Sequence, residues 1–97
     1  MEIIYQRQEY FIIQGAGGYV VINNNGAYEN HSHFSYSMEA AKNCINFAIK
    51  RLIPKRSKYM AIACKRISTD EEYKEMIDEY LKQEKGRRYF NNSCFRR

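Results

Sequence analysis

Apolar residues dominate the first third of the chain and follow the two-residue period of β-strands only loosely. Ile, Val, Phe and Tyr crowd three short segments, which favours strands because branched and aromatic side chains fit a pleated surface. A fourth, more polar segment predicts a weaker returning strand. The four segments are residues 2–5, 9–14, 19–23 and 27–33. Because residues 6–8 fit either a turn or the middle of one long strand, we expect an antiparallel β-meander of about three strands over residues 2–34.

Glycine marks two turns between these strands. Gly15-Ala16-Gly17-Gly18 separates two of them, and Asn25-Gly26 predicts a type I′ hairpin turn, which requires positive φ at both central residues. A phosphate-binding loop also uses glycines, but it leads into a helix N-terminus. Here the first glycine segment leads into a strand, so we interpret it as a hairpin turn.

Strict alternation would give the predicted sheet two apolar faces. Tyr10, Ile12, Tyr19 and Val21 fall on one face, and Phe11, Ile13, Val20 and Ile22 fall on the other. An antiparallel sheet with helices on one side commonly shows polar residues on the other. Two arrangements therefore stay open. Helices cover one face while aromatic residues are shown on the second, or both faces are covered.

The hydrophobic period changes to that of a helix after Ser37, a residue suited to an N-cap. Apolar residues then recur at steps of three and four and form one stripe, while charged and amide side chains take the opposite side. The stripe consists of Met38, Ala41, Ile45, Ala48, Ile49 and Leu52. Pro54 ends this helix, because the residue before a proline is driven out of the helical region.

Residues 57–67 fit either a helix or a short buried strand. As a helix, the segment has Ser57 as its cap and an apolar stripe made of Tyr59, Met60, Ala63, Cys64 and Ile67. As a strand, it contains a continuous apolar run that ends at Cys64. Its Met, Ala, Lys and Arg residues favour the helix, and the strand stays as the alternative.

A third helix is predicted to begin at Thr69-Asp70-Glu71-Glu72, which forms a capping box with acidic residues in the first turn. Its apolar stripe is Tyr73, Met76, Ile77, Tyr80 and Leu81. We expect this helix to run to about Glu84 and to end at Gly86, a suitable C-cap residue. The basic tail, residues 85–97, is expected to add an edge strand or to be partly disordered.

Length and composition agree with one α+β domain over residues 1–97, in which two to three amphipathic helices pack on the N-terminal meander. Ninety-seven residues with 44% hydrophobic and 28% charged content are ordinary for a globular chain. The sequence has no stretch of signal-peptide or membrane-spanning character, so we expect a cytoplasmic protein without membrane contact. Cys44, Cys64 and Cys94 are too widely spaced for a disulfide framework or a zinc motif, and we interpret them as buried or incidental thiols.

Charge is distributed in blocks of alternating sign around a net charge of +5. Residues 40–67 carry eight bases and no acid, residues 68–84 carry seven acids and two lysines, and residues 85–97 carry five bases. The acidic block can pair with part of the basic one, but a surplus of positive surface remains. Such a surplus favours an anionic macromolecular surface as partner, either a host protein or nucleoprotein or nucleic acid itself.

Seven bases form the predicted basic patch, because they concentrate around a helix end and the turn that follows it, where positive groups suit phosphates. They are Lys50, Arg51, Lys55, Arg56, Lys58, Lys65 and Arg66. Tyr59, Tyr89 and Phe90 are candidates for stacking on nucleic-acid bases. Lys50 and Arg51 also have a structural role available, since the helix dipole favours cations at a C-terminus. A merely solvated charged surface is the alternative for the whole patch.

His31 and His33 are the one pair with metal-ligand character, because alternate residues of a strand point to the same face. No third or fourth ligand follows from the spacing, so we predict no metal and no cofactor. The sequence shows neither a nucleophile beside a base nor paired carboxylates, and we therefore predict no catalytic residues and no enzyme. A small metal-dependent enzyme that uses this histidine pair stays as a second alternative.

The expected function is that of a small non-enzymatic binding protein. Its short length and its richness in Tyr, Asn and Lys suit an inhibitor or adaptor of phage or mobile-element type. Such a protein would use the basic patch on a host nucleoprotein or another anionic surface. A module that binds nucleic acid directly is the first alternative. The oligomeric state does not follow from the sequence.

Overall fold

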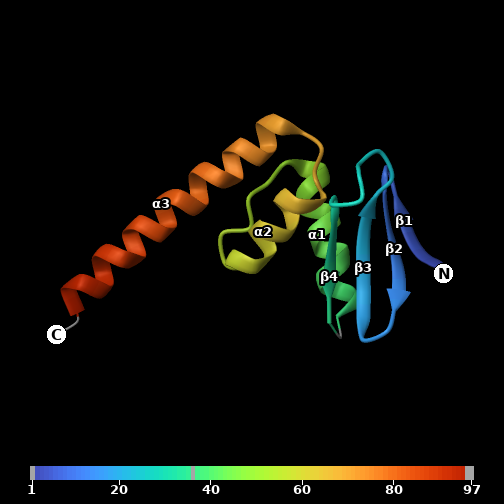
Figure 1. Cartoon of the computed structure of the whole chain (residues 1–97), viewed down its shortest axis with the longest axis horizontal. Coiled ribbons are helices and arrows are strands. Elements are labelled where there is room, and N and C mark those ends of the chain that lie inside the picture. Colours follow the sequence, from blue (N-terminus) through green and yellow to red (C-terminus); the bar gives the residue numbers. More distant parts are fainter. Residues whose placement is uncertain (1, 36, 96–97) are drawn as a thin grey trace.

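The computed structural model describes residues 2–35 and 37–95, with side chains described up to residue 83, and confirms the α+β arrangement. Four strands come first and three helices follow (Figure 1). The strands are β1 (Ile3–Arg7), β2 (Tyr10–Gly15), β3 (Gly18–Asn23) and β4 (His31–Phe34), which form one antiparallel sheet in the order β1-β2-β3-β4. The helices are α1 (Met38–Lys50), α2 (Lys58–Ile67) and α3 (Glu71–Phe95). None of these described helices is both long and apolar enough to cross a bilayer.

The first hairpin decides between the two alternatives left open for residues 6–8, and the second turns where the sequence predicts a turn. Strands β1 and β2 are joined at Gln8, which has a φ of 57°, so this segment is a hairpin and not one long strand. Strands β2 and β3 pair as far as Gly15 and Gly18, and Gly17 in the connection has a φ of 85°. Glycine suits that position because it has no Cβ to oppose a positive φ. The glycine segment is therefore a hairpin turn, as predicted.

The connection between β3 and β4 differs from the prediction. Asn25 and Gly26 do not take the positive φ that a type I′ turn requires, and strand pairing resumes only at His31 instead of Ala27. The side chain of Asn30 organises the longer loop, because its Oδ1 accepts a hydrogen bond from the N–H of Ala27. The same oxygen lies 2.7 Å from the position that a Cβ on Gly26 would take. Any larger residue at position 26 would clash with the side chain of Asn30, so this position requires glycine.

Two buried asparagines fasten this loop to the end of α2. The side chain of Asn23 donates a hydrogen bond to the carbonyl of Ile67 (2.9 Å). The side chain of Asn30 donates to the carbonyls of Arg66 (3.0 Å) and Ser68 (3.3 Å). The last carbonyls of a helix have no partner within the helix. The asparagines therefore cap α2 from a distant part of the chain.

Replacing Asn30 with alanine will lower the free energy of unfolding by about 1–3 kcal/mol, because buried carbonyls lose their donor. Urea denaturation followed by circular dichroism measures the change. Asn24→Ala is the matched control, since the Asn24 side chain is exposed and we expect an effect below about 0.5 kcal/mol. Equal stability of the two variants would contradict the capping role of Asn30.

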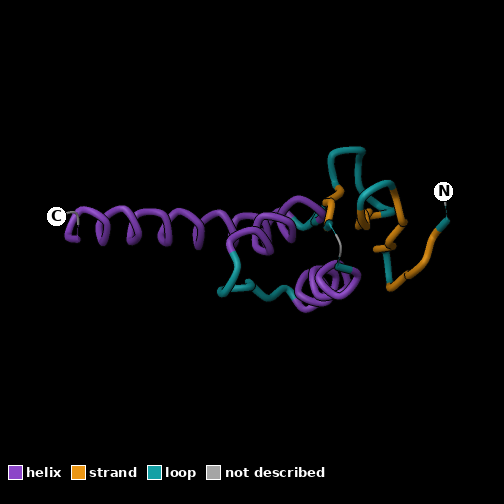
Figure 2. Tube along the Cα trace, turned by 90° about the horizontal axis from the view of Figure 1, so that it is seen from below, coloured by secondary structure: helices purple, strands orange, loops and turns teal. Residues whose placement is uncertain are grey.

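One face of the sheet carries the core. Tyr10, Ile12 and Val21 are buried on the central strands, and Tyr19 and Phe34 pack at the margin of the same cluster. Helices α1 and α2 contact β3 and β4, and Figure 2 shows the helices gathered on one side of the strands. The sequence left open whether one face of the sheet or both faces are covered, and this arrangement decides between the two. Helices cover one face, and the second face shows mainly aliphatic residues that are partly exposed.

Serine residues cap the first two helices, as predicted. The Oγ of Ser37 accepts a hydrogen bond from the N–H of Ala40 (3.0 Å), and the Oγ of Ser57 accepts one from the N–H of Met60 (3.1 Å). Residues 57–67 are therefore a capped helix and not the alternative strand. The buried side chains are Ala41, Cys44, Ile45 and Ala48 on α1, and Ala61, Ala63, Cys64 and Ile67 on α2.

Three residues assigned to apolar stripes lie outside the core, and one of them, Met76 in the middle of α3, is 41% exposed. Leu52 is half-exposed because α1 ends at Lys50 and the chain changes direction before Leu52. Tyr59 is 85% exposed, and Ala61 takes an inward position on α2 instead. The errors at Leu52 and Tyr59 fall at helix ends, where the helical period no longer predicts the direction of a side chain.

Helix α3 differs from its prediction at both ends. Asp70 is the N-cap in place of Thr69, because its Oδ1 accepts hydrogen bonds from the N–H groups of Glu72 and Tyr73. At the other end, the backbone is helical through Gly86 and on to Phe95, where the sequence favours a C-cap followed by an edge strand or a disordered tail. A glycine inside a helix is unfavourable by only about 1 kcal/mol, so the helix can continue through it.

Stability should fall at alkaline pH because two tyrosine hydroxyls are buried. Burial, helped by the charge of Glu9, raises the pKa of Tyr10 to about 12, and burial also raises the pKa of Tyr73. Tyrosine in the unfolded chain ionises near pH 10, so the folded state holds these protons more tightly. This stability is fully present below about pH 10 and is lost as the pH rises toward 12.

We expect the free energy of unfolding to drop by at least about 2 kcal/mol between pH 9 and pH 12, which is the share of Tyr10 alone, and Tyr73 should add to it. Guanidinium denaturation at a series of pH values measures the drop, and Tyr10→Phe should make it smaller. A stability that stays constant up to pH 12 would show that these hydroxyls are not buried.

Candidate binding groove at the Pro54 turn

The candidate site lies where the chain leaves α1 and enters α2. After Lys50, Arg51 takes a left-handed conformation (φ 56°), and its N–H donates to the carbonyl of Ala48. Pro54 is buried in the loop that follows, and Ser57 then caps α2. The loop thus reverses the chain between two helices that pack on each other.

Two tyrosines of α3 hold this loop in place. The hydroxyl of Tyr73 donates to the carbonyl of Leu52 (2.6 Å), and the hydroxyl of Tyr80 donates to the carbonyl of Lys55 (3.0 Å). Tyr73 is completely buried, so the first of these contacts ties the loop to the core. The side chains that the loop displays therefore stand on a backbone with fixed hydrogen bonds.

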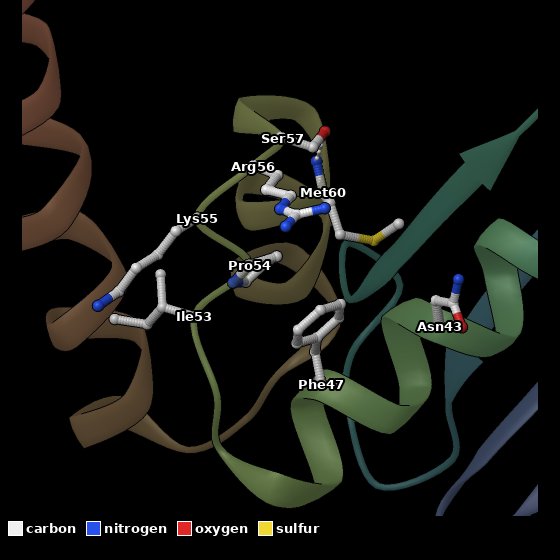
Figure 3. A pocket seen from close by; sticks show the side chains of 8 residues that line it. All are labelled: Asn43, Phe47, Ile53, Pro54, Lys55, Arg56, Ser57 and Met60. Atoms are coloured by element: carbon white, nitrogen blue, oxygen red, sulfur yellow. Dashed lines mark hydrogen bonds between the residues drawn. The ribbon is translucent and has the colours of Figure 1, made fainter.

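A hollow of about 390 Å³, which we call the Pro54 groove, opens between α1, the loop and the start of α2. Its lining residues are Asn43, Phe47, Ile53, Pro54, Lys55, Arg56, Ser57 and Met60. In Figure 3 the ring of Phe47 lies beside Pro54, with Arg56 and Met60 on the α2 side of them, while Lys55 extends toward α3. Apolar walls with a few polar groups are the usual composition of a binding pocket.

The electrostatic environment of the Pro54 groove is positive. Lys55 and Arg56 line it, Lys58 follows in the first turn of α2, and that turn contains no acid. The N-terminus of a helix adds roughly half a positive charge. None of these three cations makes an ion pair with the side chains described through residue 83. An anionic group is therefore the favoured occupant.

Two of the seven bases in the predicted patch are neutralised by the acidic helix. The guanidinium of Arg51 contacts Asp70 and Glu72, each at 3.0 Å, and the Nζ of Lys65 lies 2.6 Å from Asp78. The hydrogen bond to Glu72 and the charge of Asp70 raise the pKa of Arg51. Arg51 thereby joins the end of α1 to the start of α3, which is a structural role.

The other bases of the predicted patch do not all lie together. Lys50 is exposed in the last turn of α1. Lys65 and Arg66 belong to the C-terminal end of α2, roughly 10 Å along the helix from Lys58, and border a second hollow of about 330 Å³ that also contains Glu29. Of the seven bases, only Lys55 and Arg56 line the Pro54 groove, with Lys58 next to it in the first turn of α2. The order of residues in the sequence does not reveal this separation.

One of the three predicted stacking residues is placed by the structure. The side chain of Tyr59 is 85% exposed on the first turn of α2, next to Lys58. Its ring is thus open to a base or to a side chain of a partner. The side chains of Tyr89 and Phe90 lie outside the described residues.

No family model, curated protein or solved structure matches the chain. Roles for its residues therefore cannot be transferred from a relative. A proposal for the function is therefore based on the shape and charge of the Pro54 groove.

The histidine pair lies on β4, at the edge of the sheet. The Nδ1 of His31 is 2.7 Å from the carbonyl oxygen of Tyr28, and the two rings are 5.3 Å apart, while His33 is exposed. Among the residues with described side chains, no three His, Cys, Asp or Glu residues gather where they could hold a metal ion. The contacts of His31 are those of a residue that orders a loop.

Two of the cysteines touch, which their spacing in the sequence does not reveal. The Sγ atoms of Cys44 and Cys64 are 3.8 Å apart between α1 and α2, and both side chains are fully buried. Their hydrogen bond, together with burial, raises the pKa of Cys44, whereas the same hydrogen bond lowers the pKa of Cys64. Both thiols fill space in the core as small apolar side chains do. The side chain of Cys94 lies outside the described residues.

Proposed function

We propose that the chain is a non-enzymatic binding protein whose Pro54 groove takes an acidic segment of a partner protein. The observation that supports the proposal is an apolar hollow bordered by cations without a described counter-ion. An apolar side chain of the partner would pack on Phe47 and Pro54, and a carboxylate next to it would bind Arg56. Arginine suits this role because its planar fork binds a carboxylate through two parallel hydrogen bonds.

The sign of the charge narrows the choice of partner. The nucleic-acid-binding site of a host protein is itself positively charged. Such a site on the partner would therefore repel Lys55, Arg56 and Lys58. An inhibitor or adaptor role, of the phage or mobile-element type, therefore fits best if the target is an acidic segment of a host protein. A hollow of about 390 Å³ holds one or two side chains, which suits recognition of a short peptide segment.

Direct binding of single-stranded nucleic acid is the second candidate, and the exposure of Tyr59 favours it. The ring could stack on a base while Lys58 and its neighbours contact phosphates. Binding of this kind would weaken steeply with salt, because phosphate contacts release counter-ions.

Fluorescence anisotropy with defined probes separates the two candidates. The probes are fluorescein-labelled acidic peptides with one central Leu, Phe or Trp, the same peptides with Ala at that position, and labelled oligo-dT. The proposal predicts saturable binding of the anchored peptides, about tenfold weaker binding once the anchor is Ala, and weaker binding of oligo-dT. Preferential binding of oligo-dT would favour the second candidate, and the absence of saturable peptide binding would refute the proposal.

A further inference from the structure

The face of the sheet that points away from the helices carries two cross-strand rows of apolar residues, which we call the outer sheet face. The strand register places Ile3, Ile13 and Val20 in one row that ends at His33. It places Phe11 and Ile22 in the second row, between Gln6 and His31. Ile3 is exposed, and the other apolar members are partly exposed.

Charged side chains are absent from both described rows of the outer sheet face. Arg7, the one Lys or Arg within the described strands, reaches to the helix side, and Lys42 of α1 contacts the sheet from that side. The guanidinium of Arg7 donates to the side chain of Asn46 on α1, and the Nζ of Lys42 lies 4.9 Å from the ring centre of Tyr5. A nucleic acid or a charged protein surface would find polar partners only at the ends of the rows, in Gln6, His31 and His33. An uncharged, flat apolar surface is the complementary one.

We propose that the outer sheet face pairs with the same face of a second copy of this chain. Two identical sheets related by a two-fold axis can pack face to face at about 10 Å, as the layers of a β-sandwich do. Pairing would remove the partly exposed aliphatic residues from water, which is the main driving force for association.

The distribution of charge is compatible with a second copy as the occupant. Each chain carries a net charge of +5, so two copies repel each other unless their basic surfaces are kept apart. In this dimer the helix layers, which carry the bases of residues 42–66, lie on opposite outer sides. The two basic layers are then roughly 30 Å apart, several times the Debye length of about 8 Å.

The size of the outer sheet face sets the expected strength of the dimer. Four strands with about 4.8 Å between neighbours, each about five residues long at roughly 3.3 Å per residue, cover roughly 300 Å² in plan. Counted on both copies this is roughly 600 Å², below the roughly 1,200 Å² at which standard interfaces begin, so the contact belongs to the small, transient class. We therefore expect a reversible dimer with a Kd on the order of tens of micromolar.

Sedimentation equilibrium over a range from about 5 to 500 µM tests the proposal. The average mass should rise with concentration from 11.6 kDa toward twice that value. Val20→Lys should keep the chain monomeric, whereas Tyr59→Lys, which adds the same charge at an exposed site on α2, should leave the dimer unchanged. A monomer at every concentration would overturn the proposal, and so would a dimer that persists in Val20→Lys.

Circular dichroism establishes whether Val20→Lys folds. If it does not, Val20→Thr decides the matter, because threonine keeps the branched shape and adds only a hydroxyl. In that variant we expect the dimer Kd to rise several-fold, and an unchanged Kd would count against the outer sheet face as the interface.

Discussion

Replacing Tyr73 with alanine will lower the free energy of unfolding by about 3–5 kcal/mol. The ring is fully buried, and its hydroxyl reaches the carbonyls of Leu52 (2.6 Å) and Phe47 (3.4 Å). Truncation leaves a cavity in the core. It also leaves the carbonyl of Leu52 without its donor, so the loop loses a hydrogen bond that holds it in place. Since small domains are stable by only about 5–15 kcal/mol, this variant will be close to unfolding at room temperature. Urea denaturation measures the effect.

Tyr59→Ala is the matched control for this change, because the same residue type is removed from a site that is 85% exposed. We expect it to alter stability by less than about 0.5 kcal/mol. Tyr73→Phe separates the ring from the hydroxyl and should lower stability by about 1–2 kcal/mol. Similar losses in Tyr73→Ala and Tyr59→Ala would show that α3 does not dock through Tyr73.

Reversing the charge of Arg56 will weaken the binding of an anchored acidic peptide by about 10- to 100-fold. A hydrogen bond between charged groups is worth about 1.5–3 kcal/mol, and a glutamate at this position adds repulsion. Arg56 is exposed and makes no ion pair with a described side chain. The fold and its thermal midpoint should therefore be unaffected by Arg56→Glu. Anisotropy titration of the variant measures the loss.

Arg66→Glu provides the control, because it makes the same charge reversal on an exposed residue at the other end of α2. We expect its affinity for the peptide to stay within about twofold of the unsubstituted chain at physiological salt, where screening limits distant charges. Equal losses in both variants would mean that overall charge drives the binding and that the Pro54 groove has no special part in it.

Much of the fold follows from local signals in the sequence. Ser37 and Ser57 cap helices where the sequence places them, and the glycines at 15–18 form the predicted hairpin turn. These features depend on the chemistry of one turn of backbone, so neighbours in the sequence are sufficient to specify them. The β3–β4 loop was not predictable in this way, because Asn30 bonds to the end of α2, 36 and 38 residues away.

The candidate site was less accessible to sequence reasoning. The run of bases identifies a positive region, but the loss of Arg51 and Lys65 to acids of α3 depends on how three helices pack. The apolar part of the Pro54 groove combines Phe47 of α1 with Met60 of α2. These two residues lie close together because the turn between the helices brings α1 and α2 side by side. The contact between Cys44 and Cys64 has the same origin. Such tertiary juxtapositions leave no periodic signal in the sequence.

The most direct test of the binding site is to map an anchored acidic peptide on the ¹⁵N-labelled chain by NMR. We expect the largest shifts of backbone amides, at increasing peptide concentration, to fall on the lining of the Pro54 groove, at Asn43, Phe47, Arg56, Ser57 and Met60. We also expect Arg56→Glu to abolish these shifts. Shifts that concentrate at Lys65 and Arg66 or on the outer sheet face, or that persist unchanged in Arg56→Glu, would contradict binding in the Pro54 groove.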